Sequence, residues 1–258
     1  MFKLTKRRRF VLSSIVLTIG LFVIQQGTVS DRYFAIGILS GVSLLLTLWS
    51  LGIPIKSHVW LLSWILPLLF TVSVSLFYFL LPSTLLSLMP ILALYLVGMY
   101  VLLLSENIFF VTSIRTIQLY RSATAVSFLF TLLTAFLLFD TLLSFHLSFY
   151  INALFVFGLS FLLFLHCFWN TRLEEGISKR IFVYSLVIAW VLASLGMVIS
   201  FWPVNISQGS LLLTAVTYIL IGLTQAKLND RLFNQVVREY LVIGLVVFLV
   251  TILSTRWG

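Results

Sequence analysis

The chain has 258 residues, of which 61% are hydrophobic and only 9% are charged. Because soluble domains carry about 25% charged residues, this composition excludes an ordinary water-soluble domain and favours a protein that lies in lipid. The formal net charge is +9, but the chain has no polar domain on which basic and aromatic residues interleave, so we expect no nucleic-acid partner.

Nine apolar runs are long enough to be transmembrane helices, since about 20 apolar residues cross a hydrocarbon core. These runs are Phe10–Gln26, Phe34–Ile53, Val59–Leu81, Leu85–Ser105, Ala123–Phe145, Leu147–Phe168, Ile181–Trp202, Ser210–Ala226 and Tyr240–Thr255. Each must be helical, because lipid offers no partner to an open backbone N–H or C=O group. The sequence predicts an all-α polytopic integral membrane helix bundle, with residues 1–258 as a single transmembrane domain and no soluble domain.

The first run follows a basic arm, and a signal peptide shares this arrangement. No A-x-A-like cleavage site follows, since the chain continues through Gln26, Gly27 and Thr28. We therefore expect an uncleaved first helix. The alternative is cleavage, which would remove one span and leave the orientation of the others unchanged.

Prolines fall in the third and fourth runs, at Pro67 and Pro90. Proline lacks an N–H group and its ring clashes with the carbonyl four residues earlier, so it can kink a helix. We interpret both as packing adaptations, with a gating role as the alternative.

Basic residues occupy every second gap between the runs. Fourteen of the sixteen Lys and Arg residues lie in the N-terminal arm and in the second, fourth, sixth and eighth gaps, and the other two are Arg32 and Arg256. Positively charged loops stay in the cytoplasm. The pattern therefore predicts nine transmembrane helices, with the N-terminus cytoplasmic and the C-terminus outside.

Ionisable residues are scarce in the middle of the runs, where they would be costly and would indicate a functional site. Asp140, Glu106, His146 and His166 lie near or beyond the ends of runs, so we expect their side chains to reach headgroups or water. The single Cys167 excludes a disulfide framework within the chain, and neither a metal-ligand spacing nor a nucleotide or hydrolase motif occurs. We predict no catalytic residue, no metal ion and no cofactor.

A few polar residues remain as candidates. Asn152 lies in the sixth run, where its amide should contact a neighbouring helix, with substrate contact as the alternative. The periodicity of two predicted cytoplasmic segments, Ser105–Ala125 and Lys227–Tyr240, suits short amphipathic helices at the membrane interface. We favour solvated connectors for both segments, with a functional role as the alternative. Together they could form a cytoplasmic polar site, and its arginines would attract anionic lipid headgroups. The residues of this possible site are Glu106, Arg115, Arg121, Arg231 and Arg238.

The middle third of the chain resembles a known family. The residues that carry the resemblance are Glu106–Phe109, Arg115–Leu119, Thr131–Phe136 and Phe139–Asp140. They are similar to an uncharacterised family of bacterial multi-pass membrane proteins. The resemblance implies a bacterial inner membrane and a multi-pass topology, and it implies no activity.

Three classes of function remain open. The first is a non-enzymatic membrane component that acts in assembly, as a scaffold or in the cell envelope. The second is a transporter or channel for a small or lipidic solute, which would need a polar cavity at mid-depth that reaches Asn152 or the hydroxyl groups of the third and seventh runs. The third is a membrane enzyme that acts on a lipid-linked substrate, which would need carboxylates, arginines and histidine to converge at one interface.

Overall fold

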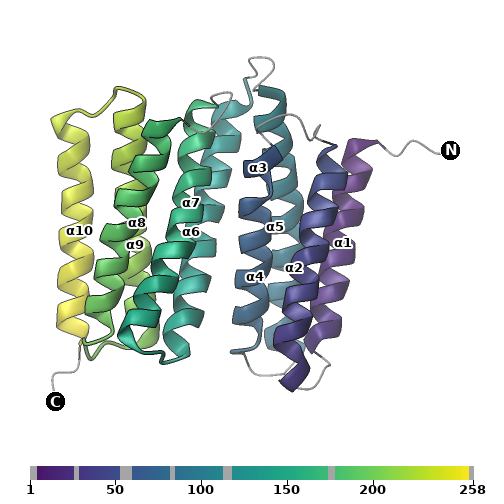
Figure 1. Ribbon diagram of the computed structural model, residues 1–258, viewed down its shortest axis with the longest axis horizontal. Coiled ribbons are helices and arrows are strands. Elements are labelled where there is room, and N and C mark those ends of the chain that lie inside the picture. The colour runs from purple at the N-terminus through teal and green to yellow at the C-terminus, as the bar shows by residue number, and fades with distance from the viewer. Residues whose placement is uncertain are drawn as a thin grey trace. The chain divides into compact units, whose positions relative to one another are not determined.

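The computed structural model describes residues 5–25, 29–52, 60–81, 85–112, 118–173 and 178–255. Every regular element in these ranges is an α-helix (Figure 1). The helices are α1 (Lys6–Gln25), α2 (Val29–Leu51), α3 (Trp60–Ser63), α4 (Ile65–Tyr78), α5 (Leu85–Thr112), α6 (Tyr120–Ser144), α7 (Phe149–Arg172), α8 (Lys179–Ile199), α9 (Ile206–Leu228) and α10 (Asn234–Ser254). The all-helical prediction is confirmed.

Seven helices in the described ranges are long and apolar enough to cross a membrane. They are α5 to α10 and the part of α2 that begins at Arg32. The predicted apolar runs coincide with the helices, except that the third run is divided between α3 and α4. These findings fit a multi-pass membrane protein, while the number of nine crossings and the orientation of the termini stay predictions.

The interruption of the third run lies where Pro67 requires it. The ring of a proline clashes with the carbonyl of the residue four positions earlier, which here is Ser63, the last residue of α3. Helix α4 then begins at Ile65 and has 14 residues, a length of about 21 Å. Pro90 has a smaller effect, since it lies close to the start of α5, which continues to Thr112.

The chain forms two compact units, residues 1–130 and 131–258. In the first unit α1 packs against α2 and α5, and α4 packs against the same two helices. In the second unit α8 and α9 pack against α7, and α10 packs against α9 (Figure 1). Helix α6 begins in the first unit and ends in the second. The prediction of a single transmembrane domain stays a prediction.

A buried chain of hydroxyl groups joins three helices of the first unit. The Thr71 Oγ1 atom of α4 lies 2.9 Å from the Ser43 Oγ atom of α2 and 2.9 Å from the Tyr95 hydroxyl oxygen of α5. All three side chains are completely buried. Phe70 stacks on the Tyr95 ring, with 5.7 Å between ring centroids. This core therefore combines apolar packing with hydrogen bonds that fix the register of the helices.

The outer faces of the second unit are apolar. Trp190 on α8 is 66% exposed and Leu253 on α10 is 83% exposed, and most of α10 has no covering from the rest of the described chain. A soluble monomer rarely exposes an apolar surface this large. These faces are compatible with a lipid environment, because hydrocarbon tails contact such side chains without penalty.

We predict that Thr71→Val lowers the free energy of unfolding by about 1 kcal/mol, because it removes two interhelical hydrogen bonds worth about 0.6 kcal/mol each. The measurement is a reversible SDS titration of the purified protein in mixed micelles. The control is Thr18→Val, since the Thr18 hydroxyl donates only to the Ser14 carbonyl of its own helix. If both variants unfold at the wild-type midpoint, the hydroxyl chain does not stabilise the unit.

Candidate functional site

Two turns of the second unit enclose a polar cavity of about 250 Å³, which we call the Asn152 pocket. One turn joins α6 to α7 and the other joins α8 to α9. The residues that line the pocket are Leu143, His146, Leu147, Asn152, Ile199, Ser200, Trp202, Val204, Asn205 and Ile206. Since a water molecule occupies about 30 Å³ in the liquid, the pocket has room for a small polar molecule or for several waters.

The first turn is set by His146. Its φ angle of 47° lies in the left-handed region, so helix α6 cannot continue past Ser144. The Nδ1 atom of His146 lies 2.8 Å from the Ser144 carbonyl oxygen. Because a carbonyl can only accept, Nδ1 carries the proton and Nε2 is the acceptor of the neutral ring.

Asn152, in the first turn of α7, connects the two turns. Its Nδ2 group donates to the Leu147 carbonyl and to the Ser200 Oγ atom, both at 3.3 Å. The Leu147 carbonyl can only accept, which fixes the orientation of the amide. The side chain is 4% exposed, and its Oδ1 atom is buried without a hydrogen-bond partner in the described chain. A residue that lines the pocket therefore carries a buried acceptor whose hydrogen-bonding capacity is not used within the described chain.

A buried carboxylate lies one helical turn from the pocket wall. Asp140 of α6 is three positions before Leu143 and is only 7% exposed. The Ser210 Oγ atom of α9 donates to the Asp140 Oδ1 atom at 3.0 Å. The expectation that the side chains of Asp140, Glu106 and His166 reach headgroups or water is wrong, because all three are buried. Neighbouring helices pack over these positions. The order of residues along one helix does not reveal where another helix packs.

Basic residues gather at the opposite end of the second unit. The Arg172 Nε atom donates to the Leu228 carbonyl at 3.0 Å, and its Nη2 atom donates to the same carbonyl and lies 3.7 Å from an Asp230 carboxylate oxygen. Arg172 thus caps the end of α9. Across residues 131–173 and 178–255, every Lys and Arg lies near the helix ends on this side or in the turn between α9 and α10. They are Arg172, Lys179, Arg180, Lys227, Arg231 and Arg238.

Lys227–Tyr240 contains a connector, as favoured from the sequence, and the single amphipathic helix that its periodicity suits is wrong. Helix α9 extends to Leu228, Asp230 adopts a left-handed φ angle of 55°, and α10 begins at Asn234. The segment is therefore the end of one helix, a turn and the start of another. The apolar residues do recur at helical spacing, but they lie on two separate helices, α9 and α10, rather than on one.

The predicted cytoplasmic site is divided among parts of the chain. Glu106 is buried and Arg121 is exposed in the first unit, whereas Arg231 and Arg238 are exposed in the second. Arg115 lies outside the described residues, as does the centre of the predicted amphipathic helix in Ser105–Ala125. Convergence of these residues stays a prediction.

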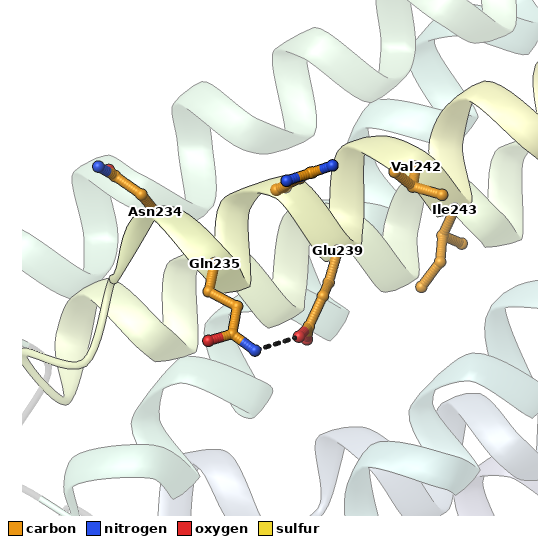
Figure 2. Close-up of a pocket in the computed structure, with 6 residues that line it drawn as sticks. Asn234, Gln235, Glu239, Val242 and Ile243 are labelled. Carbon is orange, nitrogen blue, oxygen red and sulfur yellow. Dashed lines mark hydrogen bonds between the residues drawn. The ribbon is translucent and has the colours of Figure 1, made fainter.

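A second hollow, of about 860 Å³, lies along the first half of α10. Figure 2 shows Gln235 and Glu239 on the same side of this helix, where the Gln235 Nε2 atom donates to the Glu239 Oε1 atom at 3.3 Å. Arg238 also lines the hollow. All the described lining residues belong to one helix, so groups from different elements do not converge here as they do in the Asn152 pocket.

Other polar side chains in the second unit contact one another within the helix bundle. Cys167 is buried, and the Gln225 Nε2 atom donates to its Sγ atom at 3.3 Å. Asn170 lies 3.2 Å from the His166 ring, one turn away on α7. The described residues contain no group of His, Cys, Asp or Glu that could hold a metal ion.

Comparison with known proteins gives one match. The model of a family described as "Protein of unknown function (DUF5656)" matches residues 52–254. No curated protein and no solved structure matches the chain. The expected similarity to an uncharacterised family is confirmed over a longer range than the middle third, and this range includes every residue that lines the Asn152 pocket. The bacterial origin stays a prediction.

We predict that Arg172→Ala lowers the free energy of unfolding by about 1 kcal/mol, because hydrogen bonds from a charged donor to the end of α9 are lost. Arg172→Lys should restore part of this loss, since lysine keeps the charge but not the two-pronged contact. The measurement is again an SDS titration, and Arg231→Ala, which removes an exposed charge, is the control. Equal midpoints for Arg172→Ala and the control would contradict the capping role.

Proposed function

Since the chain belongs to this family of unknown function, whose description names no activity, we propose a role from the structure: a non-enzymatic, multi-pass component of the bacterial inner membrane that binds a small polar group at its non-cytoplasmic face. The observation that carries the proposal is the polarity of the second unit. Its described basic residues lie at one end, and the Asn152 pocket lies at the other. Such a protein would act as a scaffold or assembly component of the cell envelope.

Contacts of the N-terminal arm support the proposed threading. The Lys6 Nζ atom donates to the Asn107 Oδ1 atom near the end of α5 at 3.2 Å, and the Arg9 guanidinium lies 5.3 Å from the centre of the Trp49 ring near the end of α2. The start of α1 and the ends of α2 and α5 thus share one side of the first unit. This is the side that the alternating basic gaps assign to the cytoplasm.

Transport is the second candidate, and one observation favours it. The pocket reaches Asn152 and Ser200, which are among the polar groups that a transport cavity would need. However, its lining comes from the ends of helices and the two turns rather than from the middle of the helices. A pocket at one end suits binding at a membrane surface better than passage through the membrane, so we place binding first.

We predict that reporters fused after Ser30, Ser83, His146, Gln208 and Gly258 all report the outside of the cell, and that one fused after Asp230 reports the cytoplasm, because basic gaps resist translocation. Paired alkaline phosphatase and green fluorescent protein fusions at each position give this measurement. An inside signal at Gly258 with the others unchanged would remove one span. An inside signal at His146 and Gln208 would contradict the proposed face of the pocket.

We predict that the exposed arginines of the second unit hold anionic lipid. Each basic residue near an anionic surface is worth about 1 kcal/mol, so Arg231→Ala with Arg238→Ala should reduce the amount of co-purified anionic lipid. The double lysine variant should retain the lipid if surface charge alone acts, and should lose it if a phosphate needs the planar guanidinium. The control is Arg32→Ala, on the side predicted to be outside. Equal anionic lipid in the wild type and in both double variants would limit these arginines to topology.

A further inference from the structure

We propose that the Asn152 pocket binds a primary ammonium group, from either an aminophospholipid headgroup or a small free amine. Such binding would follow from the geometry of the pocket, and it does not require the proposed role as a scaffold. Three observations carry it: the acceptors in the wall, the charge at this end of the unit, and the neighbouring apolar groove.

The pocket wall offers hydrogen-bond acceptors. Asn152 lines the pocket, and its Oδ1 atom is buried without a hydrogen-bond partner in the described chain. The donation from Nδ2 to the Leu147 carbonyl fixes the orientation of the amide. The proton on His146 Nδ1 is directed to the Ser144 carbonyl, which makes Nε2 an acceptor in the neutral ring. An unmet buried acceptor is costly, so the site favours a ligand with N–H or O–H groups.

The charge at this end favours a cation among such ligands. Asp140 places a buried carboxylate one turn from the pocket wall. The described basic residues of the second unit lie at the far end of the helices, and α7, with 24 residues, separates the two ends by about 36 Å. An ammonium group therefore gains both hydrogen bonds and electrostatic attraction, whereas a hydroxyl group gains only hydrogen bonds.

The donors distinguish a primary from a quaternary ammonium. A primary ammonium carries three N–H donors, which match an open amide oxygen and an imidazole acceptor. A quaternary ammonium has no donor and is recognised by a cage of aromatic rings. Among the lining residues, only Trp202 and His146 carry rings, so the pocket lacks the composition of such a cage.

An apolar groove beside the pocket favours the lipid as the source. It lies between α7 and α8, has a volume of about 360 Å³, and is lined by residues that include Ala153, Leu154, Phe157 and Trp190. Ala153 directly follows Asn152 in the chain, so the groove begins at the same end of α7. An acyl chain fits such a surface, while the headgroup amine of the same lipid would reach the polar pocket.

The test measures binding of two probes to the whole protein. Ethanolamine is titrated against protein in nanodiscs of phosphatidylcholine and phosphatidylglycerol, and retention of phosphatidylethanolamine is quantified in nanodiscs that contain it. The variants are Asp140→Asn, which keeps a group that can accept from Ser210, and Asn152→Leu. The matched control is Gln225→Leu, which removes a half-buried amide near the other end of the unit. Folding of each variant is checked by its SDS unfolding midpoint.

We expect both pocket variants to weaken binding at least tenfold, the control to bind as the wild type does, and tetramethylammonium and ethylene glycol to compete poorly. Retention of phosphatidylethanolamine without binding of ethanolamine identifies the lipid as the source, and binding of both probes shows that the free amine suffices. The proposal is overturned if the wild type binds neither probe, if folded Asp140→Asn binds as tightly as wild type, or if tetramethylammonium competes as well as ethanolamine.

Discussion

The structure depends on one constraint: hydrocarbon provides no hydrogen-bond partner, so polar groups in the apolar helices must find partners within the protein. The backbone meets this constraint by forming helices. Many Ser and Thr hydroxyls meet it by donating to the carbonyl four residues earlier in their own helix, at distances of 2.6–2.9 Å. Examples are Ser14, Thr141, Ser185, Thr217 and Thr251. Local pairing of this kind satisfies these hydroxyl groups within their own helices.

Not every polar group pairs in this way, since the buried hydroxyls of Ser13, Thr47 and Ser160 have no hydrogen-bond partner in the described chain. Other polar groups join helices, as Thr71 does with Ser43 and Tyr95, and Ser210 does with Asp140. Others lie at helix ends, where the backbone itself leaves groups open. In the second unit the two ends differ in kind, because one carries the basic residues and the other carries an acceptor-lined pocket. A helix bundle with this asymmetry is suited to bind different headgroup chemistry at its two ends.

The sequence predicted the helices well because a run of about 20 apolar residues has few alternatives to a membrane helix. It identified Pro67 as a residue that can kink a helix, but it predicted one continuous run over Val59–Leu81, which the structure divides between α3 and α4. The errors arise where the outcome depends on other elements. Asp140 is buried because Ser210 and its helix pack against it from 70 positions away, and the Asn152 pocket exists because two turns adjoin. The periodicity of Lys227–Tyr240 suits a single amphipathic helix that does not form, because helical periodicity does not reveal a left-handed residue such as Asp230.

Spin labelling in nanodiscs tests whether lipid covers the exposed apolar faces. The buried Cys167 would be replaced by alanine, and single labels placed at Leu245 on α10 and Val187 on α8, which are 59% and 51% exposed. If lipid covers these faces, both labels should collide often with oxygen, which dissolves in hydrocarbon, and rarely with a water-soluble nickel chelate. Frequent collisions with the nickel chelate would show that these faces meet water, and rare collisions with both reagents would show that protein covers them. Either result would contradict coverage of these faces by lipid.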